Sequence, residues 1–214
     1  MNGATTTIGG GTWVASAIAN QDGSLIGNTT GGGAVLPVSL STDMIYTLSM
    51  DIALTGTAGS AKYIHFGFVD QSTLIAAGGN NASDRFNNNT MNGYPTIALV
   101  TATAMIQGTE LYNAVVASTA NATISATHNY KMVLDTSGDG SSFKATYFLD
   151  GVAFGTDLVM DYAALSAIGG VGFSSRNGTG IIDNFLLTAE TIPEPGAALL
   201  NGLGVLALLR RRRP

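Results

Sequence analysis

Hydrophobic and polar residues alternate along most of the chain up to about residue 190. The longest run covers residues 45–55, where large apolar side chains from Tyr46 to Leu54 alternate with Thr, Ser, Asp and Ala. A period of two predicts a β-strand that buries one face and exposes the other. We expect further strands at residues 12–19, 34–40, 62–69, 96–105, 130–134, 143–149, 168–174 and 181–188.

Turn-forming residues separate these runs. Residues 136–140 read Thr-Ser-Gly-Asp-Gly, and Asp150-Gly151 follows the next run. Both favour hairpin turns, because Gly and Asp tolerate positive φ angles. Residues 78–94 form the longest stretch without periodicity, and residues 161–167 suit one short turn of helix. Many short strands without long helices between them predict an all-β, antiparallel sandwich.

This set of strands resembles the concanavalin A-like jelly rolls, of the LamG and glucanase type, that occur in many bacterial surface proteins. The runs that carry the resemblance are residues 46–54, 64–69, 130–136, 143–151, 171–173 and 181–185. The resemblance covers most of residues 10–190. It implies one jelly-roll domain over residues 1–190, and a fold so widely reused says little about function.

The charge of the chain excludes one class of partner. The net charge is −5, with 14 Asp and Glu against nine Lys and Arg. Four of the basic residues are Arg210 to Arg213 at the C-terminus, so the rest of the chain is strongly acidic. An acidic body repels phosphate, which argues against nucleic-acid binding. The chain has no cysteine and therefore no disulfide, thiol nucleophile or cysteine-bound zinc.

The composition changes abruptly after Ile192. Pro193, Glu194 and Pro195 come first, followed by residues 196–209 without a charge and then by the four arginines. The apolar run of about 14 residues is shorter than the roughly 20 that usually span a bilayer. Snorkelling arginines and local thinning can make up the difference. We expect a short hydrophobic helix that anchors the chain in a membrane, with the arginines on the cytoplasmic side.

The order of these elements at the C-terminus resembles the PEP-CTERM sorting signal of Gram-negative bacteria. The matching residues are the motif Pro193, Glu194 and Pro195, the apolar segment 196–209, and the basic cluster Arg210, Arg211, Arg212 and Arg213. The resemblance implies that residues 191–214 are a sorting tail recognised by exosortase, a membrane-embedded cysteine protease-transpeptidase. It further implies export, anchoring in the inner membrane until processing, and transfer to the cell surface or extracellular matrix.

Members of that family begin with a signal peptide. Residues 1–12 have neither a basic n-region nor an apolar h-region. We therefore expect that the start is truncated or that the start codon is misplaced.

The sequence argues against glycosidase chemistry. Retaining glycosidases need two carboxylates about 5 Å apart, and the glucanases of this fold carry a strand of the type Glu-x-Asp-x-x-Glu. The glutamates here are Glu110, Glu190 and Glu194, and none has an acidic partner at that spacing. We expect neither an enzyme nor a cofactor.

Metal binding is also not expected. Asp135 and Asp139 flank a glycine-rich loop that faintly resembles a calcium loop, but calcium needs several converging oxygens. We expect both aspartates to cap a hairpin instead. His65 and His128 lie far apart, with no ligand spacing around either.

A sugar site is the remaining candidate. In residues 62–69, Tyr63 and His65 alternate with Ile64, Phe66 and Phe68, so they belong to the opposite face of the strand. The nearby loop adds polar and aromatic residues that a lectin-like groove could use. The candidate ligand-binding residues are Tyr63, His65, Arg85, Asn87 and Tyr94. The alternative is that these residues fill a second packing interface.

Together these observations predict an exported surface or extracellular-matrix protein with a structural or polysaccharide-associated role. Its expected partners are exosortase, the membrane and extracellular polysaccharide. The main alternative is a lectin-type carbohydrate-binding module. A divergent glycoside-active enzyme and an ice-binding protein are the less favoured alternatives, since only Thr101-Ala102-Thr103 hints at an ice-binding array.

Overall fold

The computed structural model describes residues 14–15, 24–25, 32–55, 63–70, 93–100, 105–109, 115–120, 126–138, 140–176 and 179–192. The strands are β1 (Val14–Ala15), β2 (Ser24–Leu25), β3 (Gly32–Pro37), β4 (Met44–Thr55), β5 (Tyr63–Asp70), β6 (Gly93–Val100), β7 (Met105–Thr109), β8 (Val115–Ala120), β9 (His128–Asp135), β10 (Ser142–Leu149), β11 (Val152–Asp161), β12 (Ile168–Arg176) and β13 (Thr179–Thr191). The helix described is α3 (Tyr162–Leu165), which lies between β11 and β12.

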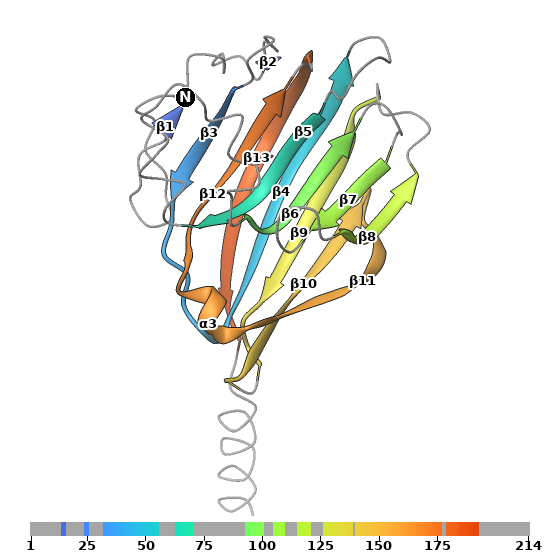
Figure 1. Ribbon diagram of the computed structural model, residues 1–214. Helices are drawn as coiled ribbons and strands as arrows, with labels where there is room; N and C mark the ends of the chain where they lie inside the picture. The colour runs from blue at the N-terminus through green and yellow to red at the C-terminus, as the bar shows by residue number, and fades with distance from the viewer. Residues whose placement is uncertain are drawn as a thin grey trace, which may run out of the picture.

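The described strands form two sheets that stack face to face (Figure 1). One has seven strands in the order β1-β3-β12-β5-β6-β7-β8, and the other has six in the order β11-β10-β9-β4-β13-β2. Every strand pair described is antiparallel. Strands distant in sequence are neighbours, as where β4 lies between β9 and β13. The predicted all-β, antiparallel sandwich of jelly-roll type is confirmed.

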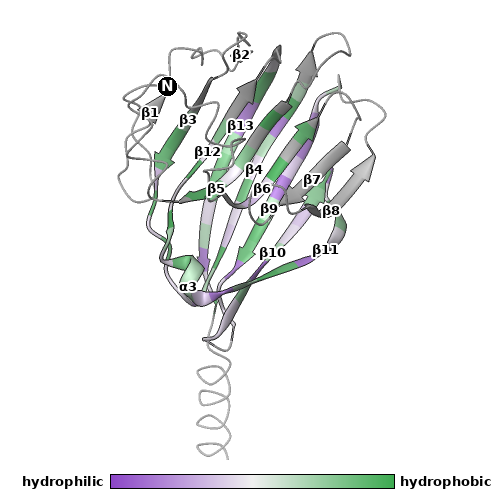
Figure 2. Cartoon of the chain, viewed as in Figure 1, coloured by the Kyte–Doolittle hydropathy of each residue, from purple (hydrophilic) through white to green (hydrophobic). Residues whose placement is uncertain are grey.

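The core lies between the sheets and follows the period of two. On β4, Leu48, Met50 and Ile52 are fully buried, and they meet Phe66 and Ile64 of β5 in one hydrophobic cluster. Figure 2 shows the same alternation as hydrophobic and hydrophilic bands along the described strands. Burying each such side chain contributes about 1.5–3 kcal/mol, so the alternation that predicts the strands also holds the sheets together.

Two sequence predictions need correction. The strand expected at residues 96–105 is a hairpin in which β6 pairs with β7, Val100 opposite Met105. The alternation along the sequence also predicts none of β2, β8 and β11, of which the longest is β11. Its register against β10 is interrupted between Ala145 and Tyr147, and Gly155 has a positive φ of 71°. The extra residues of this bulge break the alternation, so no period of two is visible in the sequence.

A second bulge lies in β13. Asp183 is opposite Asp51 and Leu186 is opposite Ser49, so two residues of β13 face one residue of β4. Asn184 takes the left-handed conformation there, with φ of 51°, which asparagine tolerates better than most residues. The bulge returns Phe185 to the core side, where its ring lies 6.1 Å from that of Phe173.

Thr136 organises the end of the sandwich where β9 and β13 finish. Its buried hydroxyl accepts a hydrogen bond from the Met44 N–H (3.0 Å) and donates to the carbonyl of Ser41 (2.9 Å). The hydroxyl of Tyr162, the first residue of α3, donates to the Thr136 carbonyl. The N–H of Ile192 donates to the Asp43 carbonyl at 3.4 Å. Three connections and the end of β13 therefore meet at this end of the sandwich.

The predicted sorting tail from Pro193 onward, including its hydrophobic helix, lies outside the described residues. The helix expected within residues 161–167 is present as α3, and the Asp161 side chain caps it by accepting from the Ala163 N–H at 2.8 Å. In the part of the chain that the structure describes, no helix has the length and apolar character of a membrane span.

Two described residues on the outer face of the seven-stranded sheet are also buried. Val35 of β3 and Val69 of β5 are 2% and 1% exposed, although neither belongs to the cluster between the sheets. Gly172 of β12 lies beside Val35 in the register. A Cβ at Gly172 would lie 2.3 Å from the carbonyl oxygen of Ala34 on the neighbouring strand. The backbone leaves no room there for a side chain.

We therefore expect Gly172→Ala to destabilise the fold more than Gly151→Ala. Gly151 has a φ of 80° but no atom within 4 Å of its added Cβ, so alanine there costs only backbone strain, about 1–2 kcal/mol. At Gly172 the clash is with backbone, and the loss should reach about 3 kcal/mol or more. Urea unfolding of both variants measures the difference. An equal or smaller loss for Gly172→Ala would contradict the close strand approach.

Candidate functional site

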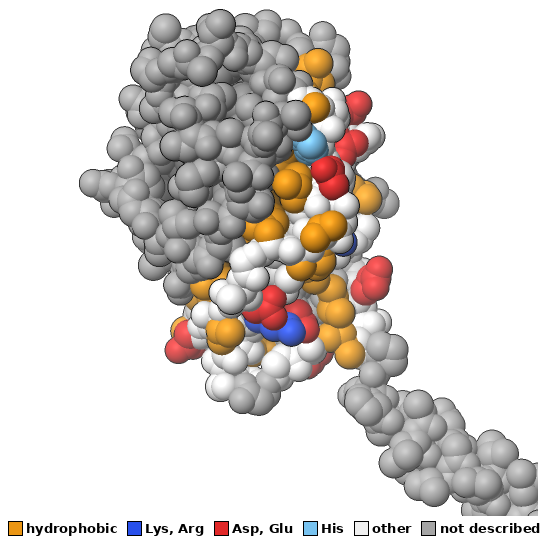
Figure 3. Space-filling model, turned by 90° about the vertical axis from the view of Figure 1, so that its right-hand side faces the viewer, with side chains coloured by type: hydrophobic (Ala, Val, Ile, Leu, Met, Phe, Trp, Pro, Cys, Tyr) orange, Lys and Arg blue, Asp and Glu red, His pale blue; other side chains and the backbone are white. Residues whose placement is uncertain are grey.

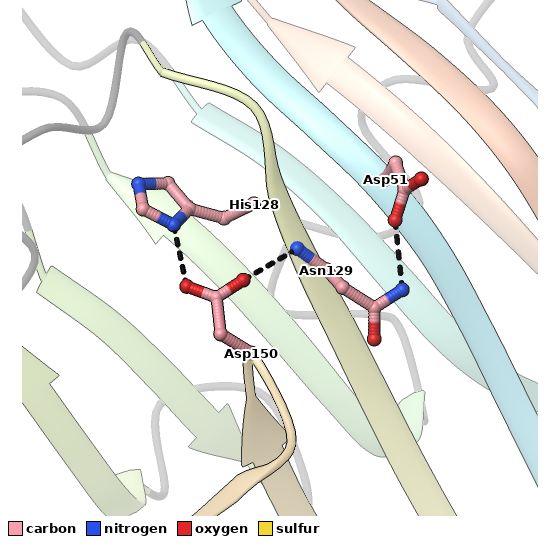
Figure 4. A network of polar contacts seen from close by, with 4 residues as sticks. All are labelled: Asp51, His128, Asn129 and Asp150. Carbon is pink, nitrogen blue, oxygen red and sulfur yellow. Dashed lines mark hydrogen bonds and ion pairs between the residues drawn. The ribbon is translucent and has the colours of Figure 1, made fainter.

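A row of hydrogen-bonded polar residues crosses one end of the six-stranded sheet, on strands that are far apart in sequence. It consists of Asp51 on β4, His128 and Asn129 on β9, Asp150 in the turn between β10 and β11, and Asn184 on β13. Figure 4 shows four of these residues and the contacts between them. We call this set the polar row.

The turn after β10 forms one end of the row. The Asp150 carboxylate accepts from His128 Nδ1 (2.7 Å) and from the Asn129 N–H (2.9 Å). The Asp150 N–H in turn donates to the Asn129 carbonyl (2.8 Å). Asp150 and Gly151 both have positive φ, as the predicted tight turn requires. The turn thus carries Asp150 back onto the first residues of β9.

Asp51 forms the middle of the row. Each of its two carboxylate oxygens accepts a hydrogen bond from a side-chain amide. Oδ1 accepts from Asn129 and Oδ2 from Asn184, both at a distance of 2.7 Å. Asn184 reaches Asp51 from the bulge of β13, where the left-handed backbone sets its position. The Asp183 carboxylate beside it accepts from the Asn184 N–H at 2.8 Å. The row is therefore held by hydrogen bonds on both sides of Asp51.

The surroundings of Asp150 favour its ionised carboxylate. The hydrogen bond from His128 is the largest effect on the pKa of Asp150; the N–H of Asn129 and the charge of His128 act in the same direction, and burial opposes them. The net result is a pKa below the ordinary value. Figure 3 shows the histidine of this face next to acidic side chains, with hydrophobic side chains between the polar groups.

Carboxylates and amides in such a row can accept and donate hydrogen bonds to a ligand rich in hydroxyl groups. Within the described ranges, no three His, Asp or Glu side chains group in a way that could hold a metal ion. Sequence reasoning missed the row, because Asp51 and Asn184 are 133 residues apart and only the strand register brings them together. The signal available in the sequence is the Asp150-Gly151 turn, which by itself indicates no ligand site.

The structure separates some of the residues predicted to bind sugar. Tyr63 of β5 lies opposite Val100 of β6, whereas Tyr94 follows Gly93, at the other end of β6. At about 3.4 Å per residue, the six residues from Tyr94 to Val100 span about 20 Å. The positions of Tyr63 and His65 alternate with the buried Ile64, Phe66 and Phe68. Arg85 and Asn87 lie outside the described residues, so this predicted site stays a prediction.

The loop weighed as a calcium site is described only in part, because Asp139 lies outside the described residues. Asp135 accepts from the N–H of Ser137 (2.9 Å) and from its hydroxyl (2.5 Å), which is a side-chain turn over the start of the loop. Burial raises the pKa of Asp135, but the two bonds from Ser137 and the charge of Lys144 outweigh it and lower the pKa overall.

No protein-family model matches the chain, and no curated protein sequence matches it. Solved structures do. The carbohydrate-binding module CBM66 from Bacillus subtilis has a TM-score of 0.53 at 16% identity, over 86% of this chain and 98% of its own. The chain has the jelly-roll fold of carbohydrate-binding modules and lectins.

Two further structures extend the comparison. A lectin from Bauhinia forficata in complex with GalNAc has a TM-score of 0.55 at 13% identity, over 89% of this chain and 91% of its own. An endo-1,3-beta-glucanase from Streptomyces sioyaensis has a TM-score of 0.54 at 14% identity, over 75% of this chain and 70% of its own. At such identities the likeness concerns the fold alone, and binding proteins and an enzyme share it.

The lowered pKa of Asp150 predicts a pH-dependent stability. A carboxylate whose folded-state pKa is depressed stabilises the fold above its ordinary pKa of 3.8, and the contribution disappears as the pH falls through the lowered value. We therefore expect Asp150→Asn to be less stable than the parent at neutral pH and equal to it in acid. Thermal unfolding against pH measures this. Glu190→Gln, at an exposed residue of β13, is the control and should show no such difference; a pH-independent loss in Asp150→Asn would contradict the lowered pKa of Asp150.

Proposed function

We propose that the protein is exported to the cell surface or extracellular matrix, where its jelly-roll domain associates with polysaccharide, and that the segment from Pro193 is an exosortase sorting tail. The observation that carries the polysaccharide role is the polar row on a fold shared with carbohydrate-binding modules and lectins. The sorting tail is supported by the position at which the described sandwich ends, which is just before Pro193.

The last strand finishes just before the sorting motif. β13 ends at Thr191, opposite Met44, and the N–H of Ile192 still bonds to Asp43. The next residue is Pro193, which has no N–H to continue a strand. The described hydrophobic cluster draws on no residue beyond Ala189. Cleavage after this point would leave the packing of the described sandwich intact, as a processed tail requires.

Binding rather than hydrolysis is the role that the row supports. The carboxylate of Asp51 is held by two amides and that of Asp150 by a histidine and an N–H. Asp183 lies opposite Asp51, but Asn184 donates to both carboxylates, and Glu190 at the other end of β13 has no carboxylate directly across from it. A retaining glycosidase needs one carboxylic acid and one free carboxylate about 5 Å apart. We therefore propose that the domain holds a glycan without cleaving it.

The sorting proposal predicts that Glu194→Ala blocks processing. Expressed with a signal peptide and exosortase, this variant should stay membrane-bound and uncleaved, because the tripeptide is the recognised element. Replacing Arg210 to Arg213 together should have a different effect, a misoriented or released protein, because these charges set orientation. Fractionation and immunoblotting measure both. Efficient release of Glu194→Ala would overturn the sorting signal.

The polysaccharide proposal predicts retention of the full-length protein on at least one immobilised glycan. Asn129→Ala should weaken that retention about fivefold, since it removes the side-chain amide that donates to Asp51 in the middle of the row. Thr188→Ala, a control on the same strand as Asn184 but opposite Thr47, should retain the parent affinity. If no neutral, amino or uronic polysaccharide retains the parent protein, the polysaccharide role is wrong.

A further inference from the structure

Two carboxylates face each other directly at one end of the six-stranded sheet. Asp183 of β13 and Asp51 of β4 are cross-strand partners in the antiparallel register. Like charges directly opposite each other destabilise a sheet. The bulge at Asn184 follows immediately, so the sheet places this repulsion where its backbone is already irregular. Such a pair is unfavourable for the isolated fold.

Neutral groups, rather than cations, hold this pair. Asn184 bridges it, with its side-chain amide on Asp51 and its backbone N–H on Asp183. Among the described residues, neither aspartate is in a salt bridge. Dipoles of this kind satisfy hydrogen-bonding capacity but leave the formal charges in place. The negative charge at this end of the sheet therefore remains uncompensated by the described residues.

The other end of the same sheet differs. There Lys144 of β10 lies 3.7 Å from Asp157 and lowers the pKa of Asp135, its cross-strand partner on β9. Lys131 is nearer to Asp51, since it lies opposite Ser49 of β4, and its ammonium is over the ring of Phe148 on β10 at 4.1 Å. Among the described residues, neither lysine forms a salt bridge with Asp51 or Asp183. The charge imbalance is local and does not extend over the face.

Apolar side chains border the acidic pair. Ile181 and Leu186, on either side of Asp183 along β13, are 52% and 54% exposed. Asp183 extends the polar row by one side chain, and the distance from Asp183 through Asp51 and Asn129 to Asp150 is about three strand spacings, roughly 14 Å. That length exceeds one sugar ring, so a chain of several sugars can lie along it, with C–H faces on the apolar residues and polar groups on the row.

We propose that this end of the outer face of the six-stranded sheet binds a polysaccharide that carries protonated amino groups, with the ammonium held between Asp183 and Asp51. The proposal rests on the polysaccharide role and names its ligand class. An ammonium between the two carboxylates gains charge-assisted hydrogen bonds and removes their repulsion. Neutral hydroxyls leave the repulsion in place, and a uronic acid chain adds to it.

Chitosan and chitin oligosaccharides of equal length test this proposal, because they differ in whether the amino group is free or acetylated. The full-length protein should bind the chitosan oligomer at least about fivefold more tightly at pH 6, and salt should weaken that binding. A uronic acid polymer of similar length should not bind. Isothermal titration or retention on the immobilised oligomers gives the ratios.

The discriminating variant is Asp183→Asn, because it should stabilise the protein and weaken ligand binding together. Losing one of two opposed charges should raise Tm by about 1–4 °C, while chitosan binding falls about three- to fivefold. Asparagine can still accept the Asn184 N–H. Glu190→Gln removes the same charge from the same strand, opposite Ile45, and should change neither quantity.

Each outcome decides between the two proposals. If neutral glycans bind as well as chitosan, or if Asp183→Asn leaves binding unchanged, the amino-sugar proposal is wrong and the polysaccharide role stands. If no glycan of any charge binds the parent protein, the polysaccharide role itself is wrong. If calcium raises Tm in the chelator-treated parent but not in Asp183→Asn, the pair holds a cation instead of a sugar amine, which also overturns the proposal.

Discussion

The structure depends on one constraint, that the large apolar side chains of the hydrophobic cluster must point into the space between the two sheets. Where the sequence keeps a strict period of two, as in β4, the strand is regular and Leu48, Met50 and Ile52 are fully buried. Where the period fails, the backbone compensates. The bulge at Asn184 allows both Ile182 and Leu187 to point inward although they are five residues apart.

The same constraint creates the candidate site. Because the bulge restores the inward phase of β13, it places Asn184 in a left-handed conformation with its amide on Asp51. If the same sequence formed a regular strand without the bulge, the residues after Asn184 would point to the opposite face. The polar row is therefore a consequence of how the core is kept in phase, which links the packing of the sandwich to the chemistry of its outer surface.

Sequence reasoning succeeded where structure is local. Unbroken alternation predicted β4, β9 and β10, and the Asp150-Gly151 dipeptide predicted the turn between β10 and β11. It failed at β11, because a bulge near Gly155 hides the period, and at residues 96–105, where two strands read as one. The polar row was out of reach for another reason: its members meet through register between strands, and register depends on the whole fold.

The two ends of β4 differ in what surrounds them. Met44, at one end, lies opposite Thr191, where the described chain finishes and the Thr136 hydrogen bonds converge. Asp51, seven residues further along, carries the polar row, and at about 3.4 Å per residue the two lie about 24 Å apart. If the tail tethers the domain to the cell, the row faces away from the point of attachment. A domain held in this way can reach a polysaccharide chain while its tether remains free for processing.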